Sequence, residues 1–570
     1  MATYTIGIDY GTNSVRALVV NTANGQEVGA AVVNYPGGTD GILLHSKDHN
    51  LARQSPVDYM ACLERVVKAA LRQARRQIGV HGNEVIGIGV DTTGSTPIPV
   101  DAQNQPMCLH PEYKKNLNAY AWLWKDHTAF EEAARITAQA KKTRPHFLAR
   151  CGGVYSSEWY WSKLWHCLNV DRGLFEATHA WIELEDYIPA VLCGVRAPED
   201  VVRGVCAAGH KAMFNRQWGG MPDAEFLASL DPRLVRLRER MPSEAFSIDH
   251  RAGRLTKAWA ATFGLPEGLP VAVGAFDAHL GAVGAGIKTG TLVKIIGTST
   301  CDIMVAKNTM QVPDIPGVCG IVDGSVLPGY IGIEAGQSAV GDIFRWFVTS
   351  VCQGHDALQV KLTAEARRLK PGASGLLALD WNNGNRTILV DPQLTGLLVG
   401  MTLHTTRAEI YRALLEATAF GALTIVNRIE EYGIPIERVV CCGGIAEKNE
   451  LFMQIYADVL NRPMFISRSC QTCALGAAIA GALAGGAYPA IEPAIEAMTG
   501  VKQKIYRPIP AHVAIYRELY GQYKVLHDAF GAVAGHTARV GHTALAGLMK
   551  NLLALKQKCA GGKRRGPESN

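Results

Sequence analysis

The sequence predicts an α/β protein built from two similar halves. Strand and helix patterns alternate from residue 4 to about residue 530. A pair of β-rich runs joined by a Gly-Thr turn occurs twice, and each pair is followed by an amphipathic helix and a buried strand that ends in glycine. We therefore expect two α/β domains around a central cleft, over residues 1–270 and 271–535, and a separate tail over residues 536–570.

The first half opens with two β-rich runs, at residues 4–9 and 15–20, which flank a turn over residues 10–14. Residues 56–78 have the periodicity of an amphipathic helix. A serine and a proline open this segment, and both are favoured where a helix begins. These patterns predict a hairpin followed by a helix that covers it.

A buried strand is predicted next, at residues 85–90. It runs into Asp91-Thr92-Thr93-Gly94-Ser95, so polar groups arrive at the carboxyl end of the strand, where α/β proteins place their ligands. Residues 100–250 are rich in Trp, Tyr and His. We interpret that segment as an insertion that shapes a substrate pocket.

The second half repeats these patterns. Residues 291–296 and 301–305 are β-rich runs on either side of a Gly-Thr-Ser-Thr turn. Helical periodicity returns at residues 406–430, and an apolar run at residues 439–442 leads into two glycines. The repetition favours two related domains over one large sheet.

Charge is concentrated at the carboxyl end of the chain. The protein has 57 basic and 51 acidic residues, a formal charge of +6. Seven basic residues and one acidic residue lie from Arg539 onward, and they account for the whole excess. Because the remaining chain is neutral, we expect no nucleic-acid partner, and we expect the tail to be basic and partly disordered.

Compartment and membrane signals are weak. The N-terminus lacks the basic and apolar regions of a secretory signal. The longest uncharged run, residues 469–491, is rich in Ala and Gly and contains Pro489, which favours a tightly packed internal helix over a membrane span. The 14 cysteines include a single Cys-x-x-Cys pair, so we interpret them as ordinary thiols. A cytoplasmic protein with no membrane partner is expected.

Two turns have the composition of phosphate-binding sites. The turn of Gly11, Thr12 and Asn13 and the turn of Gly297 and Thr298 expose backbone N–H groups and a hydroxyl that can bind an anion. Either turn alone could be a tight hairpin, but two copies indicate a nucleotide clamp. The carboxylate of Asp9, two residues before the first turn, is suited to Mg²⁺.

Asp277 is the only acid within residues 271–287, a segment crowded with Gly and Ala. It could cap the helix that follows. The alternative is a general base for a substrate hydroxyl, since an unpaired buried carboxylate is costly. The neighbouring glycines do not complete a P-loop or a GxGxxG motif, which disfavours both of those classes.

These motifs resemble the FGGY family of carbohydrate kinases. The matching segments follow the family's order and are Gly7-Ile8-Asp9-Tyr10-Gly11-Thr12-Asn13-Ser14-Val15-Arg16, Asp277 in its Gly/Ala frame, Gly297-Thr298-Ser299-Thr300, and Cys442-Gly443-Gly444 with Asn449, Gln454, Ala457-Asp458 and Pro463. They extend from residue 6 to about residue 490. The resemblance implies two RNase H-like domains of the actin and hexokinase type, and phosphoryl transfer from ATP, with Mg²⁺, to a sugar hydroxyl.

Six further segments are most similar to the branch of this family that phosphorylates L-ribulose, and they cover residues 35–38, 91–97, 123–127, 152–159, 208–212 and 334–338. By that resemblance, the sugar site is lined by Gly94, Lys211, Asp277 and Glu334, and the substrate is L-ribulose, with D-ribulose as a further candidate. Asp277 would be the catalytic base that activates O5. The two Gly-Thr turns would hold the phosphates of ATP, while Gly443, Gly444 and Asn449 would bind adenosine.

Two other readings remain open from the sequence. The chain could be another kinase of this family that acts on xylulose, ribitol or glycerol, or a non-catalytic actin-like nucleotide binder. As single residues, Lys211 and Glu334 have the character of solvated surface groups, and only their segments indicate a pocket. Kinases of this type are often dimers, so a homodimer is a further expectation.

Overall fold

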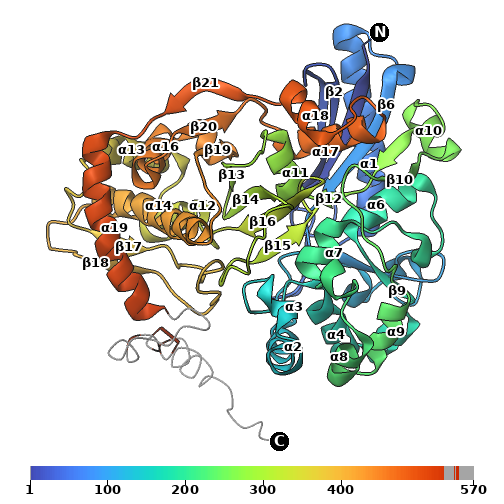
Figure 1. Cartoon of the computed structure of the whole chain (residues 1–570), viewed down its shortest axis with the longest axis horizontal. Helices are drawn as coiled ribbons and strands as arrows, with labels where there is room; N and C mark the ends of the chain where they lie inside the picture. Colours follow the sequence, from blue (N-terminus) through green and yellow to red (C-terminus); the bar gives the residue numbers. More distant parts are fainter. Residues whose placement is uncertain (1, 532–544, 546, 548, 551, 553–570) are drawn as a thin grey trace, which may run out of the picture.

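The computed structural model describes residues 2–531 together with residues 545, 547, 549, 550 and 552. Apart from those five positions, the predicted basic tail lies outside the described residues. The described chain forms two large mixed sheets with helices around and between them (Figure 1).

The first sheet has seven strands, with β10-β11-β6-β1-β2-β3 as its main path and β12 paired to β6. The strands are β1 (Tyr4–Tyr10), β2 (Ser14–Asn21), β3 (Glu27–Asn34), β6 (Val85–Thr92), β10 (Arg251–Arg254), β11 (Pro270–Ala272) and β12 (Ala275–Phe276). Strands β1, β2 and β3 are antiparallel neighbours, whereas β6 is parallel to β1 and β11 is parallel to β6. Every residue of β1 is buried, as expected for a central strand.

The second sheet has seven strands in the order β15-β16-β14-β13-β19-β20-β21. They are β13 (Thr291–Ile296), β14 (Thr300–Lys307), β15 (Gly320–Asp323), β16 (Tyr330–Ala335), β19 (Arg438–Cys442), β20 (Met464–Ser467) and β21 (Val501–Tyr506). Strands β13, β14 and β16 form an antiparallel set, and β19 and β20 continue it in parallel with β13. This order repeats that of the first sheet, so the prediction of two similar α/β halves is confirmed.

The long helices lie where the sequence predicts them. Helix α1 (Pro56–Ile78) packs on β3 and β2 through its apolar stripe. Helix α14 (Arg407–Glu431) begins at Thr406, whose hydroxyl accepts a hydrogen bond from the N–H of Glu409 while the Glu409 carboxylate accepts from the N–H of Thr406. The start of α14 therefore follows from its capping residues, whereas α1 begins at Pro56, as predicted, without a side-chain hydrogen bond from Ser55.

Two helices rich in small residues lie between the sheets, α11 (Asp277–Gly284) and α17 (Thr472–Ala484). The uncharged run of the sequence forms α17, and 12 of its 13 residues are buried. A Cβ on Gly7 or Gly89 would lie within 2 Å of a carbonyl oxygen of this helix, so the backbones of β1 and β6 touch α17 directly. None of the helices that the structure describes is long and apolar enough to cross a membrane.

A helical lobe is inserted within the first sheet in sequence, between β6 and β10. Its helices are α2 (Phe130–Thr143), α3 (His146–Ala149), α4 (Tyr160–Val170), α5 (Arg172–Ala177), α7 (Val205–Lys211), α8 (Ala224–Leu230) and α9 (Arg233–Glu239). Helices α6 (Leu184–Cys193) and α10 (Lys257–Phe263) pack instead in the core of the first sheet. The indoles of Trp122, Trp161, Trp165 and Trp181 are buried in the core of the lobe. Most aromatic residues of the predicted insertion therefore stabilise the lobe itself.

The remaining elements complete the two halves. Small sheets are formed by β4 (Leu43–Leu44), β5 (Ala52–Gln54) and β8 (Ala121–Trp122), by β7 (Pro97–Val100) and β9 (Ala180–Glu183), and by β17 (Leu377–Leu379) and β18 (Leu397–Val399). The second half also contains α12 (Gly341–Trp346), α13 (Asp356–Arg367), α15 (Gly444–Lys448), α16 (Glu450–Leu460), α18 (Ile491–Met498) and α19 (Pro510–Phe530).

Candidate functional site

The first Gly-Thr turn joins β1 to β2. The N–H of Gly11 donates to the carbonyl of Ser14 at 3.0 Å and closes the turn. Thr12 is fixed from two sides, because its carbonyl accepts from Gln54 Nε2 at 2.6 Å and its hydroxyl accepts from Trp124 Nε1 at 3.1 Å. The amide of Asn13 donates to a backbone carbonyl on the loop after β3. The turn is thus rigid and partly open to solvent.

The second Gly-Thr turn occupies the equivalent place between β13 and β14. Gly297 N–H donates to the carbonyl of Ser299, and both Gly297 and Thr298 are exposed. The carbonyl of Thr298 accepts from the N–H groups of Val340 and Asp342 at the start of α12. An exposed hydroxyl on a turn anchored in this way can meet a phosphate without a large entropic cost.

Asp9 is the second-last residue of β1 and is 4% exposed. Its carboxylate accepts from Arg16 Nη1 at 2.9 Å, across the β1–β2 pair. On the other side of β1, Asp9 is in register with Asp91 of the parallel strand β6. The end of β1 therefore lies between a cation and a second acid.

Asp277 is the first residue of α11, directly after β12. Its carboxylate accepts from the N–H of the next residue, Ala278, at 2.6 Å, and α11 has no side-chain cap, so the alternative of a helix cap is not supported. Burial, together with the charge of Asp9, raises the pKa of Asp277 to about 7. A half-buried carboxyl that titrates near neutrality can accept a proton at neutral pH.

Asp91 was part of a predicted strand end but was not among the predicted site residues. It is fully buried, and neither of its carboxylate oxygens has a hydrogen-bond partner among the described residues. Burial raises the pKa of Asp91 well above its usual range, and the charges of Asp9 and Asp277 raise it further. Asp9, Asp91 and Asp277, which we call the carboxylate cluster, come from three adjoining strand ends.

The other predicted sugar-site residues gather around the ring of Phe276. A Cβ on Gly94 would lie 1.8 Å from this ring, and Lys211 Nζ lies 5.6 Å from its centre. Lys211, on α7, forms hydrogen bonds of 3.1 and 3.3 Å with the carboxylate of Glu334 on β16. Gly94, Lys211, Asp277 and Glu334 are thus brought together, although neither Lys211 nor Glu334 is a surface group.

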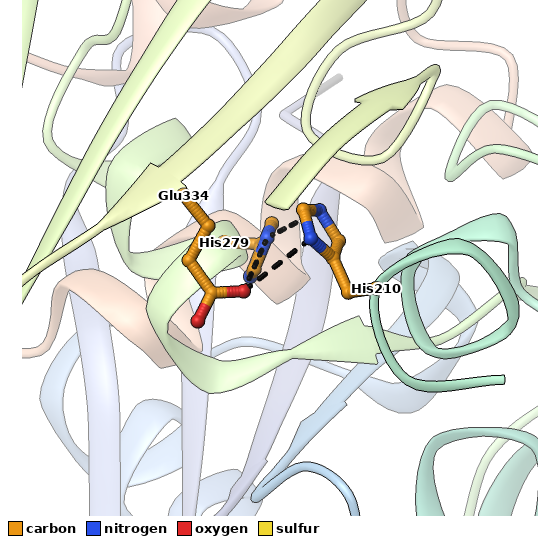
Figure 2. A group of neighbouring side chains, drawn as sticks. All are labelled: His210, His279 and Glu334. Atoms are coloured by element: carbon orange, nitrogen blue, oxygen red, sulfur yellow. Dashed lines mark hydrogen bonds and ion pairs between the residues drawn. The ribbon is translucent and has the colours of Figure 1, made fainter. Parts of the chain in front are cut away.

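Two buried histidines lie beside this pair, His210 on α7 and His279 on α11 (Figure 2). His210 lies within residues 208–212, one of the matching segments, but no sequence pattern predicts a role for either histidine. Burial opposes the ionisation of Glu334, but the Lys211 ammonium holds the pKa of this carboxyl well below its usual range. Glu334 is therefore an anion that accepts hydrogen bonds.

The predicted adenosine loop follows β19. Gly443 has φ of 100°, and a Cβ there would lie 2.2 Å from the carbonyl oxygen of Ile296, the last residue of β13. Gly444 is exposed, with no atom within 4 Å of a Cβ placed on it. The side-chain oxygen of Asn449 accepts from the N–H of Phe452 and so caps α16. The loop adjoins the second Gly-Thr turn, and its two glycines leave a flat backbone surface.

The chain matches two family models in succession. Residues 4–284 match the N-terminal domain of the FGGY family of carbohydrate kinases, and residues 292–485 match the C-terminal domain of that family. The chain is 42% identical to the ribulokinase of Halalkalibacterium halodurans over 97% of each chain. It is 43% identical to the ribulokinase of Geobacillus thermodenitrificans over 93% of this chain and 94% of that protein.

Solved structures share the fold at lower identity. The xylulose kinase from Rhodospirillum rubrum superposes with a TM-score of 0.74 and 23% identity, covering 92% of this chain and 98% of that one. The gluconate kinase from Lactobacillus acidophilus superposes with a TM-score of 0.75 and 18% identity, covering 93% and 99%. These proteins are named for different substrates. The likeness therefore identifies the fold, and the substrate has to be inferred from the residues of the site.

Proposed function

The chain belongs to the FGGY family of carbohydrate kinases, and we propose that it transfers the terminal phosphoryl group of ATP to O5 of L-ribulose. The observation that carries the proposal is the meeting of Asp277, a carboxyl with a pKa near neutrality, with the buried Lys211–Glu334 pair around Phe276. The identity of 42% and 43% to two ribulokinases supports ribulose as the sugar. Within this proposal L-ribulose is the substrate, with D-ribulose as a second one. Such an enzyme would act in the cytoplasm, in the catabolism of L-arabinose.

We assign ATP to the two Gly-Thr turns and the adenosine loop. Thr12, Asn13 and Thr298 would donate to the β- and γ-phosphates, while the N–H groups of Gly11 and Gly297 close the two turns that hold these side chains. The anchoring of both turns supports this role, because preorganised donors stabilise charge without rearranging during the reaction. Gly443 and Gly444 would lie against adenosine, with Asn449 holding the start of α16 beneath them.

The carboxylate cluster suits Mg²⁺. Its three acids come from adjoining strand ends, and Arg16 is the only basic side chain that forms an ion pair with them among the described residues. Two unpartnered oxygens on Asp91 are the donors that a hard cation prefers. We therefore assign Mg²⁺ to Asp9, with Asp91 as a second acid beside it. When bound, the ion would neutralise negative charge on the phosphates of ATP.

In the proposed reaction, Lys211 and Glu334 bind hydroxyls and the ketone oxygen of the open-chain sugar. Asp277 orients the 5-hydroxyl and removes its proton as O5 attacks the γ-phosphorus in line. Because phosphoryl transfer needs little covalent work from the protein, these residues act mainly by positioning. Closure of the two halves would exclude water as a competing acceptor.

The deciding experiment measures ADP release with ATP, Mg²⁺ and one acceptor at a time. We expect kcat/KM to be highest for L-ribulose, lower for D-ribulose, and lower again for xylulose, ribitol and glycerol. A higher kcat/KM for xylulose or glycerol than for L-ribulose would show that the chain is a kinase of this family with a different substrate. Nucleotide binding without ADP release from any acceptor would instead indicate a non-catalytic binder.

A further inference from the structure

The four residues His210, Lys211, His279 and Glu334, which we call the histidine cluster, connect three separate parts of the chain. Lys211 and its neighbour His210 end α7, His279 lies in the first turn of α11, and Glu334 comes from β16 of the second sheet (Figure 2). All four side chains are buried, with 1% to 6% of their surface exposed. A buried polar group needs a partner, so the hydrogen bonds of this cluster can be accounted for one by one.

The imidazoles lie between Glu334 and α11. His210 Nδ1 is 3.4 Å from Glu334 Oε2, and His210 Nε2 is 3.0 Å from His279 Nε2. A Cβ on Gly320 would lie 2.1 Å from His210 Nδ1, so the ring of His210 is confined on the side of β15 as well. Burial lowers the pKa of His279 to about 4 and that of His210 well below its usual range, so both rings are neutral at neutral pH.

The hydrogens of the two rings follow from these contacts. The contact of His210 Nδ1 with Glu334 is electrostatic, because at 3.4 Å it lies outside hydrogen-bond geometry and Nδ1 has no hydrogen-bond partner among the described residues. An ionised carboxylate attracts an N–H and repels a lone pair, so it favours the form of His210 with the hydrogen on Nδ1. In a neutral ring the other nitrogen, Nε2, is then an acceptor. His279 Nε2 must therefore be the donor of the 3.0 Å contact between the rings. Ser325 Oγ, 3.0 Å from the same nitrogen of His210, can turn its hydrogen toward it or toward the carbonyl of Val322.

Two histidines and a glutamate are also a common set of zinc ligands, and here their ligand atoms lie within 4.8 Å of one another. The position of Lys211 argues against a metal ion. Its ammonium lies 3.1 Å from the same Glu334 oxygen that faces His210, and a divalent cation there would meet this positive charge at close range. Lys211 is the cation of the cluster.

We propose that His279 is a positioning residue for the sugar site: its N–H orients His210, which in turn orients Glu334 beside Lys211. This inference rests on the proposed function, because it concerns the residues assigned to the sugar. His279 is on the same helical turn as Asp277, so the chain of contacts also ties the sugar-binding carboxylate on β16 to the helix that carries the catalytic base. It would keep the distance between bound sugar and base constant.

The test compares two amides at position 279. His279→Gln places an amide near the position of Nε2 and can donate to His210, whereas His279→Asn places it near Nδ1, where it cannot reach. We expect H279N to raise both the KM and the Kd for L-ribulose about tenfold, with kcat and the KM for ATP within twofold of wild type. H279Q should restore most of the affinity. His404→Asn, at an exposed histidine, is the matched control.

A double-mutant cycle with Glu334→Gln separates positioning from a general loss of packing. In the E334Q background, H279N should change the Kd for L-ribulose less than twofold, because the group that it orients no longer carries a charge. An unchanged Kd in H279N, or an equal tenfold effect in both backgrounds, would overturn the proposal. Circular dichroism and the affinity for ATP show whether each variant is folded.

Two outcomes distinguish this inference from its premise. If wild type does not phosphorylate L-ribulose, the proposed function itself fails. If wild type is active and H279N binds the sugar normally, only the positioning role fails. Zinc analysis of the purified enzyme completes the test. We expect less than one tenth of a zinc ion per chain in wild type. One zinc ion per chain in wild type and none in H279N would show that the cluster is a metal site instead.

Discussion

Asp9 and Asp91 lie side by side at the ends of two parallel strands, and the structure pairs an arginine with Asp9 alone. Asp91 has no hydrogen-bond donor on either oxygen, although it is fully buried. Burial and the neighbouring acids raise the pKa of Asp91, so its ionised form is unfavourable unless a cation joins it. This arrangement leads to the first prediction.

Asp91→Asn should weaken the binding of the divalent cation about 10- to 100-fold, because one of the acids beside the ion is removed. Mn²⁺ titrations followed by electron paramagnetic resonance measure this affinity directly. Without metal, D91N should melt at a higher temperature than wild type, since an amide is easier to bury than an acid. Asp200→Asn, at an exposed acid, is the control, and equal Mn²⁺ affinity in D91N and D200N would contradict the assignment.

Asp277→Asn should lower kcat by ~10²- to 10⁴-fold, because the amide cannot accept the proton of the attacking hydroxyl. The Kd values for ATP and L-ribulose should stay within a few-fold of wild type. Single-turnover kinetics and calorimetry measure the two effects separately. A variant that kept normal kcat would remove Asp277 from the role of base.

The pH dependence of kcat/KM should follow the ionisation of Asp277. Its pKa is raised from 3.8 to about 7, so activity should fall as pH drops below about 7. The same shift means that the folded protein binds more protons than the unfolded protein between these two values, so this group's contribution to stability decreases as pH rises through that window. Urea unfolding at pH 5 and pH 7 should show a smaller pH dependence in D277N than in wild type.

Lys211→Met should destabilise the protein by about 3–5 kcal/mol, because it leaves the Glu334 carboxylate buried without its ammonium partner. The double variant K211M/E334Q should recover part of this loss. Lys68→Met is a matched control, since Lys68 forms an exposed pair with Glu64 that should contribute about 0–1 kcal/mol. Denaturant unfolding gives all three values, and equal losses in K211M and K68M would argue against a buried pair.

Thr298→Val should raise the KM for ATP about tenfold and leave the KM for L-ribulose unchanged, because the exposed hydroxyl is assigned to a phosphate oxygen. Initial rates with each substrate varied in turn provide the test. Thr143→Val, on the exposed face of α2, serves as the control. If only the KM for the sugar changed, the assignment of the second Gly-Thr turn to ATP would be wrong.

The sequence predicts the elements better than the contacts between them. Local patterns were sufficient for α1, for the two hairpins and for the strand ends that carry Asp9 and Asp277, because periodicity and turn chemistry are local. The Lys211–Glu334 pair joins residues 123 positions apart, and nothing near either residue indicates that it is buried. Asp91 was missed for a similar reason, since only the packed sheet shows that its oxygens have no partner.

Helix α17 is made from residues 472–484, yet it covers β1 and β6, which end before residue 93. During synthesis, the first sheet therefore emerges long before the helix that touches its glycines. The N-terminal region cannot complete its own core until most of the protein has left the ribosome. The first sheet therefore completes its folding late, together with the second half of the chain. A fragment that stops at residue 270 would expose the backbone of its central strands.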